Sequence, residues 1–187
     1  MSLRRLSSCC LVLWLCLLAH DPATAASSTH VYLLRGIFNV SVGLDALAGK
    51  LNRFGLATGV YGHGESGTVA SDIIRDYKAG KVRTIILIGH SLGGGAAFAV
   101  ADTLSRANIP VALVISLDSS GGTAPSNVRR VVNYYVGAGQ VTGGPGFRGS
   151  LQNIDVSKIP GMDHMAIQSM SSMHQRMIGN VSAARGG

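Results

Sequence analysis

The sequence predicts an α/β protein, a three-layer sandwich in which helices cover both faces of a mostly parallel sheet of about six strands. The first observation is that short apolar runs alternate along the chain with amphipathic or small-residue stretches. The second is that two of these runs, 84–88 and 111–115, are apolar without alternation, which is typical of strands covered on both faces. The third is that the connections between the runs are short, as they are in βαβ units.

Residues 1–25 predict a secretory signal peptide rather than part of the fold. A basic start with Arg4 and Arg5 is followed by an apolar run over 9–19 and by Ala-Thr-Ala at 23–25, which fits an A-x-A cleavage site. The apolar run is too short for a stable membrane span, which needs about 20 residues. We therefore expect an exported protein, periplasmic or secreted.

Cleavage near Ala25 leaves residues 26–187, which we expect to form a single domain. All 3 cysteines lie in the leader, so we expect no disulfide in the mature domain, although it works where disulfides form. Hydrophobic residues make up 47% of the chain and charged residues 13%, which excludes a disordered protein. The formal net charge is +7, but the basic residues are scattered, so no nucleic-acid partner is expected.

Each strand is predicted by a short apolar run, and each helix by helical spacing or by small residues. The strands are expected at 31–35, 56–61, 83–88, 111–117, 128–136 and 151–156. The helices are expected at 43–54, 68–79, 92–107 and from 165 to about 181. In the first helix the apolar residues Leu44, Leu47 and Leu51 share one face. In the last helix the methionines have the same spacing, which favours a core stripe over an acyl-binding surface.

The turn between the third strand and the third helix carries the main chemical motif. Residues 89–93, Gly-His-Ser-Leu-Gly, fit G-x-S-x-G, a pattern that a chain rich in glycine and serine also produces by chance. Here the motif directly follows the most apolar strand and directly precedes a helix of small residues, which is the setting of a nucleophile elbow. Such a turn lifts the hydroxyl of Ser91 above the sheet. The alternative is an incidental serine in a glycine-rich turn.

Around this motif the sequence resembles the α/β-hydrolase family, in its lipase, esterase and thioesterase branch. The resemblance covers roughly residues 30–181 and is most specific at 85–94, Ile-Ile-Leu-Ile-Gly-His-Ser-Leu-Gly-Gly. It implies a minimal α/β-hydrolase fold, and we expect no lid because no segment is long and apolar enough to form one. It also implies that Ser91 is the nucleophile and that the acid and the histidine follow in that order.

A serine hydroxyl needs a base that takes its proton, and two histidines follow in the expected order. His164 lies at the start of the last predicted helix, whose N-terminus should meet the carboxyl edge of the sheet. His174 lies ten residues further on, about 15 Å along the helix axis, and is carried away from Ser91. We therefore predict His164 as the base and His174 as a partly buried helix residue.

The acid that orients the imidazole is predicted to be Asp118, with Asp155 as the alternative. Asp118 ends the fourth strand, next to the elbow strand, and so reaches the same edge of the sheet. In many members of the family the acid follows the next strand. Here that strand ends in Tyr-Val-Gly-Ala at 135–138, and no carboxylate comes before Asp155. Asp163 is interpreted as the cap of the last helix, and a turn-forming role is the alternative for Asp118.

An oxyanion hole needs two backbone N–H groups that point at the developing charge. The family resemblance implies one from Leu92, directly after the nucleophile, and one from the loop after the first strand. In that loop Ile37 is the first choice and Phe38 the second. Two glycine-rich loops, 62–67 and 137–150, are expected to rim the site, and the alternative is that both are plain connections.

We expect neither a cofactor nor a metal, since the mature chain has no cysteine, no H-E-x-x-H motif and no phosphate or dinucleotide loop. The predicted function is hydrolysis of a small-molecule or lipid-like carboxylic ester or thioester by Ser91, His164 and Asp118, through an acyl-enzyme. Two alternatives stay open. One is an acyltransferase with the same triad, and the other is a catalytically silent binding protein on a hydrolase fold.

Overall fold

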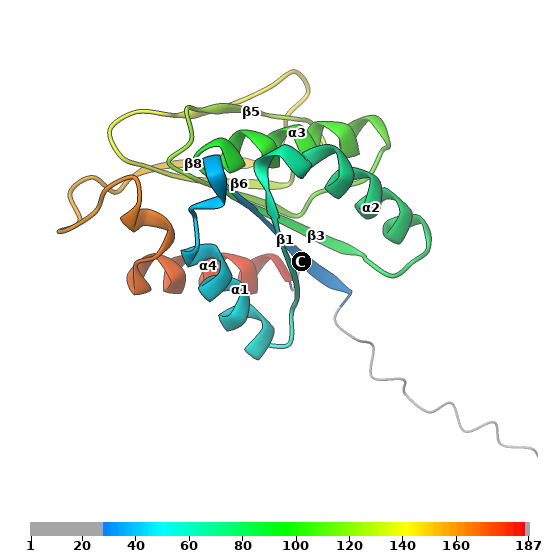
Figure 1. The fold of residues 1–187 in the computed structure, drawn as a ribbon. Helices are drawn as coiled ribbons and strands as arrows, with labels where there is room; N and C mark the ends of the chain where they lie inside the picture. Colours follow the sequence, from blue (N-terminus) through cyan, green and yellow to red (C-terminus); the bar gives the residue numbers. More distant parts are fainter. Residues whose placement is uncertain (1–27, 186–187) are drawn as a thin grey trace, which may run out of the picture.

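The structure of the chain is a computed structural model that describes residues 28–185. The signal peptide predicted at 1–25 lies outside the described residues. In the described part, strands and helices alternate along the chain, and the three-layer α/β fold predicted from the sequence is confirmed (Figure 1).

The central sheet of the described chain has six strands, all parallel, in the order β2-β1-β3-β4-β6-β8. They are β1 (Thr29–Arg35), β2 (Ala57–Gly62), β3 (Thr84–His90), β4 (Leu113–Leu117), β6 (Arg130–Tyr135) and β8 (Ser150–Asp155). Along the described chain β1 comes first, β2 lies on one side of it, and β3 and the later strands of this sheet lie on the other side. This reversal makes a topological switch point between β1 and β3. In open parallel sheets, ligands bind at the carboxyl edge of such a point.

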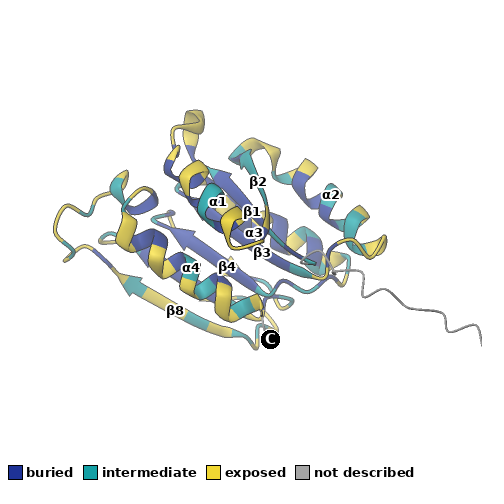
Figure 2. Cartoon of the chain, turned by 90° about the horizontal axis from the view of Figure 1, so that it is seen from below, coloured by how far each residue is buried: buried dark blue, intermediate teal, exposed yellow. Residues whose placement is uncertain are grey.

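Helices from residues 28–185 cover both faces of the sheet (Figure 1). On one face lie α2 (Ser66–Lys78) and α3 (Leu92–Arg106), and on the other lie α1 (Gly43–Arg53) and α4 (Ser171–Arg185). Both α1 and α4 are buried toward the sheet and exposed outward (Figure 2). Between residues 28 and 185, no helix has the length and apolar character that crossing a membrane requires.

The apolar runs explain the layers, because successive residues of a strand point to opposite faces of the sheet. In β3, Ile85 and Leu87 belong to the core under α2 and α3, whereas Ile86 and Ile88 belong to the core under α1 and α4. Burying one such side chain contributes about 1.5–3 kcal/mol. A strand without alternation therefore stabilises both layers.

A second, small sheet was not predicted. It consists of β5 (Gly122–Ala124) and β7 (Val141–Gly143), which pair in parallel. The segment 137–150, expected to be a continuous loop, is therefore interrupted by a strand. On β8, the side-chain amide of Asn153 binds both the backbone N–H and the C=O of Val141, each at 2.9 Å. Strands of three residues rich in Gly and Thr contain no apolar run, so hydrophobic patterning does not reveal them.

The last helix was predicted to begin at residue 165, and this boundary is wrong. Residues 166–168 form a separate 3₁₀ turn, η3 (Ala166–Gln168), and α4 begins only at Ser171. Ile167 and Gln168 are buried, so η3 turns its side chains into the core before the helix begins.

The connection before η3 is held by Asp163. Its Oδ1 accepts the backbone N–H groups of Met165 at 2.8 Å and of Ala166 at 2.6 Å. Asp163 therefore caps η3 and not the last helix, which corrects its predicted role. His164 lies in this connection and not at the start of a long helix.

Candidate active site

Ser91 lies between the last residue of β3 and the first residue of α3. Its backbone angles are φ 56° and ψ −124°, a region in which a residue with a side chain is strained. Such strain costs about 1–3 kcal/mol and persists only where the surrounding structure enforces it. The backbone N–H of Ser91 donates to the carbonyl oxygen of Leu117 at 2.9 Å, which ties the turn to the end of β4.

The close approach of strand and helix explains why glycines flank this turn. A Cβ atom at Gly89 would lie 2.0 Å from the carbonyl oxygen of Gly93. One at Gly93 would lie 2.0 Å from the carbonyl oxygen of Leu34. A side chain at either position would push α3 away from the sheet, so the turn around Ser91 depends on both glycines.

The register of the sheet brings three chain segments together at this turn. Leu34 on β1 is paired with Gly89 on β3, so Gly36 and Ser91 leave the sheet side by side. A Cβ atom at Gly36 would lie 3.0 Å from the Cβ of Ser91. On the other side, His90 is paired with Leu117 of β4, so Asp118 also leaves the sheet next to Ser91.

Asp118 and His164 meet at this edge. The Nδ1 atom of His164 lies 2.7 Å from Oδ2 of Asp118. Since a carboxylate only accepts, Nδ1 donates, and the neutral ring keeps Nε2 as an acceptor. The second carboxylate oxygen, Oδ1, accepts the backbone N–H of Val136 at 2.7 Å, so the chain that follows β6 holds Asp118 in place.

Ser91 and His164 are not joined in the same way. Within residues 28–185, no hydrogen bond joins Ser91 Oγ to the His164 ring. The residue before Ser91, His90, is close to His164: their ring centroids lie 4.7 Å apart. The side chain of His164 is 48% exposed, so it has room to move at the surface.

The other acids and the other histidine considered from the sequence are engaged elsewhere. Asp155 accepts the backbone N–H of Ser157 at 2.8 Å. Hydrogen bonds from Ser157 hold the pKa of Asp155 below its usual range. Asp163 caps η3, as described above. His174 is fully buried in α4 rather than partly buried, and its Nε2–H donates to the carbonyl oxygen of Gln168 at 2.9 Å.

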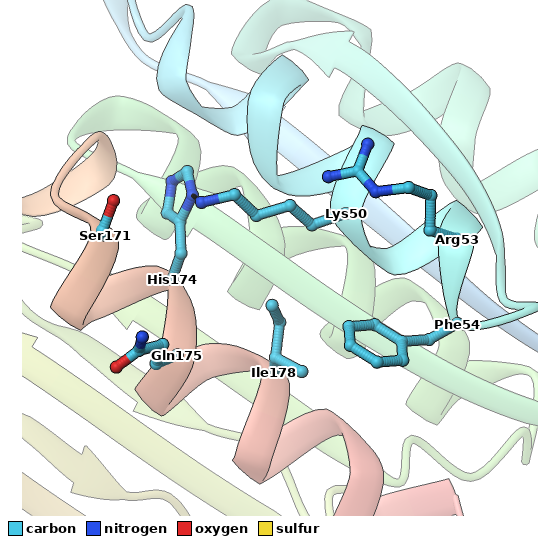
Figure 3. Close-up of a pocket in the computed structure, with 7 residues that line it drawn as sticks. All are labelled: Lys50, Arg53, Phe54, Ser171, His174, Gln175 and Ile178. Atoms are coloured by element: carbon cyan, nitrogen blue, oxygen red, sulfur yellow. Dashed lines mark hydrogen bonds between the residues drawn. The ribbon is translucent and has the colours of Figure 1, made fainter.

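A hollow of about 340 Å³ lies between α1 and α4, and its lining does not include the loops around Ser91 (Figure 3). The lining residues are Lys50, Arg53, Phe54, Ser171, His174, Gln175 and Ile178. Lys50 reaches across from α1 and donates to Nδ1 of His174 at 2.8 Å. Burial is the main cause that lowers the pKa of His174, and the nearby Lys50 lowers it further. His174 therefore helps to join two helices and does not face Ser91.

The two predicted oxyanion donors are Leu92, next to Ser91 in the chain, and Ile37, next to Gly36. Leu92 begins α3, so its N–H has no acceptor within the helix. Ile37 begins the 3₁₀ turn η1 (Ile37–Asn39) and directly follows Gly36, which is in contact with Ser91. Ile37 and Leu92 are 46% and 48% exposed.

Polar side chains that the sequence did not single out hold the loop after β1. Ser41 Oγ accepts the backbone N–H of Gly36 at 2.9 Å. His63, the first residue of η2 (His63–Glu65), donates from Nδ1 to the carbonyl oxygen of Gly36 at 3.1 Å. His63 lies in the glycine-rich loop 62–67, which the sequence predicted to rim the site, so that prediction could have identified it. Nothing in the sequence pointed to Ser41.

His90 connects this loop to His164. Its Nε2 lies 2.7 Å from the carbonyl oxygen of His164, and its Nδ1 lies 2.7 Å from Ser41 Oγ. Since a carbonyl only accepts, Nε2 carries the proton, and Nδ1 of the neutral ring accepts from the Ser41 hydroxyl. His90 is 1% exposed, and burial lowers its pKa, which favours this neutral form.

The side chains at this edge do not form a metal-binding cluster. Within the described residues, no three side chains of His, Cys, Asp or Glu are grouped so that they could hold a metal ion. The groups available at the edge are the hydroxyl of Ser91, the imidazole of His164 and the carboxylate of Asp118.

No protein-family model matches the chain, and no curated protein matches it. Among solved structures, it is similar to RedJ, a thioesterase from the prodiginine biosynthetic pathway in Streptomyces coelicolor. The TM-score is 0.52 at 8% identity, over 86% of this chain and 87% of that one. A RedJ structure with a PEG molecule in its active site gives a TM-score of 0.51 at 10% identity, over 84% and 94%. The fold is the α/β-hydrolase fold.

At identities this low, the likeness to RedJ concerns the fold alone. The resemblance to α/β-hydrolases that residues 85–94 indicated is therefore confirmed as a resemblance of fold. Ser91 occupies the turn between β3 and α3, the turn for which the sequence predicts a nucleophile elbow.

Proposed function

We propose that the protein is a serine hydrolase that cleaves carboxylic esters or thioesters. The observation that carries this proposal is the 2.7 Å hydrogen bond between His164 and Asp118, at the edge where Ser91 occupies a strained turn. Hydroxyl, imidazole and carboxylate are the three groups of a catalytic triad. The α/β-hydrolase fold and a thioesterase of similar fold support the same class of reaction.

In the proposed reaction, Ser91 Oγ attacks the acyl carbon while His164 Nε2 takes its proton. Asp118 keeps Nδ1 protonated and stabilises the imidazolium that forms. The bond from the acyl carbon to the alcohol or thiol then breaks, and the leaving group takes the proton from His164. Water, deprotonated by the same imidazole, attacks the acyl-enzyme and releases a carboxylic acid and free Ser91.

Among the described residues, the lack of a hydrogen bond between Ser91 Oγ and the His164 ring is compatible with this mechanism. In ligand-free active sites, catalytic hydrogen bonds are often long and tighten only when substrate binds. The side chain of His164 is half exposed and lies in the connection before η3, so a small rotation that keeps its hydrogen bond to Asp118 would not disturb the core.

The tetrahedral oxyanion is proposed to bind the backbone N–H groups of Leu92 and Ile37. Two such donors act mainly on the charge that develops in the transition state, and losing one typically costs about 10²–10³-fold in kcat. The support for Ile37 is that Gly36, the residue before it, is in contact with Ser91.

We also propose that the protein is exported and that the leader 1–25 is removed near Ala25. This proposal rests on the sequence pattern alone. Mass spectrometry of the exported protein tests it, because the mature chain should begin close to residue 26.

The deciding experiment compares four variants in one assay of nitrophenyl esters and thioesters of increasing chain length. Ser91→Ala and His164→Ala should reduce turnover to background, and Ser91→Ala should also abolish labelling by a fluorophosphonate. Asp118→Asn should lower kcat by about 10²–10⁴-fold, because the imidazole loses its orienting acceptor. Asp155→Asn is the matched control and should retain turnover. Full activity of Ser91→Ala would reject the proposal, and a larger loss from Asp155→Asn than from Asp118→Asn would reassign the acid.

A further inference from the structure

The hollow between α1 and α4 combines charged and apolar side chains. Its volume of about 340 Å³ lies at the lower end of the range for ligand pockets, roughly 300–1,000 Å³, so a ligand that fills it is small. Figure 3 shows Lys50 reaching His174 at one end of this space and Phe54 opposite Ile178 at the other. We name it the α1–α4 hollow.

Two cations line the α1–α4 hollow, and no acid does. Lys50 and Arg53 lie three residues apart in the last turn of α1, a spacing at which like charges repel each other. Within residues 28–185, neither side chain forms an ion pair. The sequence of α4 contains no Asp or Glu, and Asp45, the acid of α1, pairs with Arg35. The α1–α4 hollow therefore carries positive charge that the described residues do not neutralise.

The helix dipole explains only part of this arrangement. Cations in the last turn of a helix are stabilised by its dipole, which accounts for the presence of Lys50 and Arg53 on α1. It does not account for the direction of Lys50, which crosses to α4 and donates to Nδ1 of the buried His174 at 2.8 Å. An ammonium group has three N–H donors. Since the Lys50 side chain makes this one hydrogen bond among the described residues, two donors remain for a ligand.

The rest of the lining offers further donors beside an apolar surface. Within the described part of the chain, the side chains of Arg53, Ser171 and Gln175 form no hydrogen bond with the protein. Phe54 is 59% exposed, and Ile178 is half-buried. A ligand with one anionic group and an apolar body would contact both kinds of lining at once.

We propose that the α1–α4 hollow binds a small organic anion, with its carboxylate or phosphate group at Lys50 and Arg53 and its apolar body between Phe54 and Ile178. Ammonium and guanidinium groups bind both anions through charge-assisted hydrogen bonds. The lining does not include the loops around Ser91, so binding here is separate from turnover. Because the lining comes from both helices, the ligand joins α1 to α4, as the hydrogen bond between Lys50 and His174 already does.

Calorimetric titration of the protein with 3-phenylpropionate and with phenyl phosphate tests the proposal. At least one of the two should bind, and the tighter one identifies the anionic group. 3-Phenylpropanol lacks the charge, and acetate lacks the apolar body. Each should bind at least about tenfold more weakly than the tighter anion, because each loses one of the two kinds of contact. Binding of neither phenyl anion would overturn the proposal, as would equal binding of 3-phenylpropanol.

Variants of the two arginines test the place of the charged group. Arg53→Gln should raise the Kd about five- to tenfold, because it removes a charged donor and keeps a long polar side chain on the helix. Arg176→Gln is the matched control, since Arg176 is an exposed arginine of α4 outside the lining. It should change the Kd by less than twofold. Equal Kd values for the two variants would overturn the proposal.

Variants of two exposed phenylalanines test the place of the apolar body. Phe54→Asn should raise the Kd at least about threefold, because the phenyl contact is lost. Phe38→Asn is its control, since Phe38 is 84% exposed but lies in η1, outside the lining. A larger loss from Phe38→Asn than from Phe54→Asn would overturn the proposal and place the anion near Ser91. Because the titration needs no turnover, none of these results bears on the proposed hydrolase, which the Ser91→Ala assay judges separately.

Discussion

At the scale of single residues, His90 has the most specific environment near Ser91. It is the neighbour of Ser91 in the chain, and both of its ring nitrogens have partners inside the protein. One partner, Ser41, holds the N–H of Gly36, and the other is the backbone carbonyl of His164. His90 therefore acts as a positioning residue for the loop after β1 and for the proposed base.

Two variants separate the two contacts of His90. His90→Gln keeps a donor near the position of Nε2 but loses the acceptor for Ser41, whereas His90→Asn keeps the acceptor and loses the donor to His164. Each should lower kcat by about 10–100-fold with little change in KM, because small misplacements of catalytic groups act on the transition state. The measurement is steady-state kinetics with a soluble nitrophenyl ester.

A purely structural role for His90 would give a different result. The free energy of unfolding would fall, while kcat of the folded fraction would stay at the wild-type value. Denaturant titration of both variants beside the kinetics therefore distinguishes positioning from packing. Wild-type kcat in both folded variants would contradict the positioning role.

At the scale of elements, the sequence predicted the strands and helices that have long apolar patterns. All six strands of the main sheet lie where an apolar run was found, and β3 runs on to His90, directly before Ser91. The strands β5 and β7 were not predicted, because each has three residues and is too short to show a hydrophobic pattern. Likewise Val111, expected in a strand, forms only an isolated bridge to Val128.

The site was predictable only where the topology of the sheet decides the position. Ser91 and Asp118 each follow a strand, and parallel neighbours end at the same edge, so their proximity follows from the strand order. Ser41 supports Gly36 through tertiary contacts with no sequence pattern of their own. The position of His164 depends on the hydrogen bonds of Asp163 and on η3. The spacing of apolar residues along the sequence does not predict either feature.

Asp163 gives a prediction at this scale. Asp163→Ala removes the acceptor for two backbone N–H groups at the start of η3, so the protein should lose about 1 kcal/mol of unfolding free energy. It should also lower kcat, because His164 is the next residue and depends on the same connection. Asp155→Ala is the control, since Asp155 is exposed and accepts the backbone N–H of Ser157, away from η3. Unchanged kcat in Asp163→Ala would show that η3 does not position His164.

At the scale of the whole molecule, three histidines couple stability to pH. Burial is the main cause that lowers the pKa values of His30, His90 and His174 from the usual 6.5. In the unfolded chain they take up protons as the pH falls through about 6.5, whereas the folded protein resists this until lower pH. The unfolded state then binds more protons, so the free energy of unfolding should decrease as the pH falls below about 6.5.

Denaturant titrations at pH 7.5, 6 and 5 measure this decrease. The window is specific to histidine, because the pKa of Asp155 is lowered from 3.8 and its contribution is lost only in stronger acid. His30→Phe tests the cause: the ring of His30 stacks on Tyr32 at 4.2 Å, and its Nε2 is buried without a partner among the described residues. Phenylalanine keeps the stacking and removes the proton site, so the variant should be at least as stable at pH 7.5 and lose less stability at pH 5. An unfolding free energy that stays constant from pH 7.5 to 5 in the wild-type protein would show that these imidazoles titrate alike in both states.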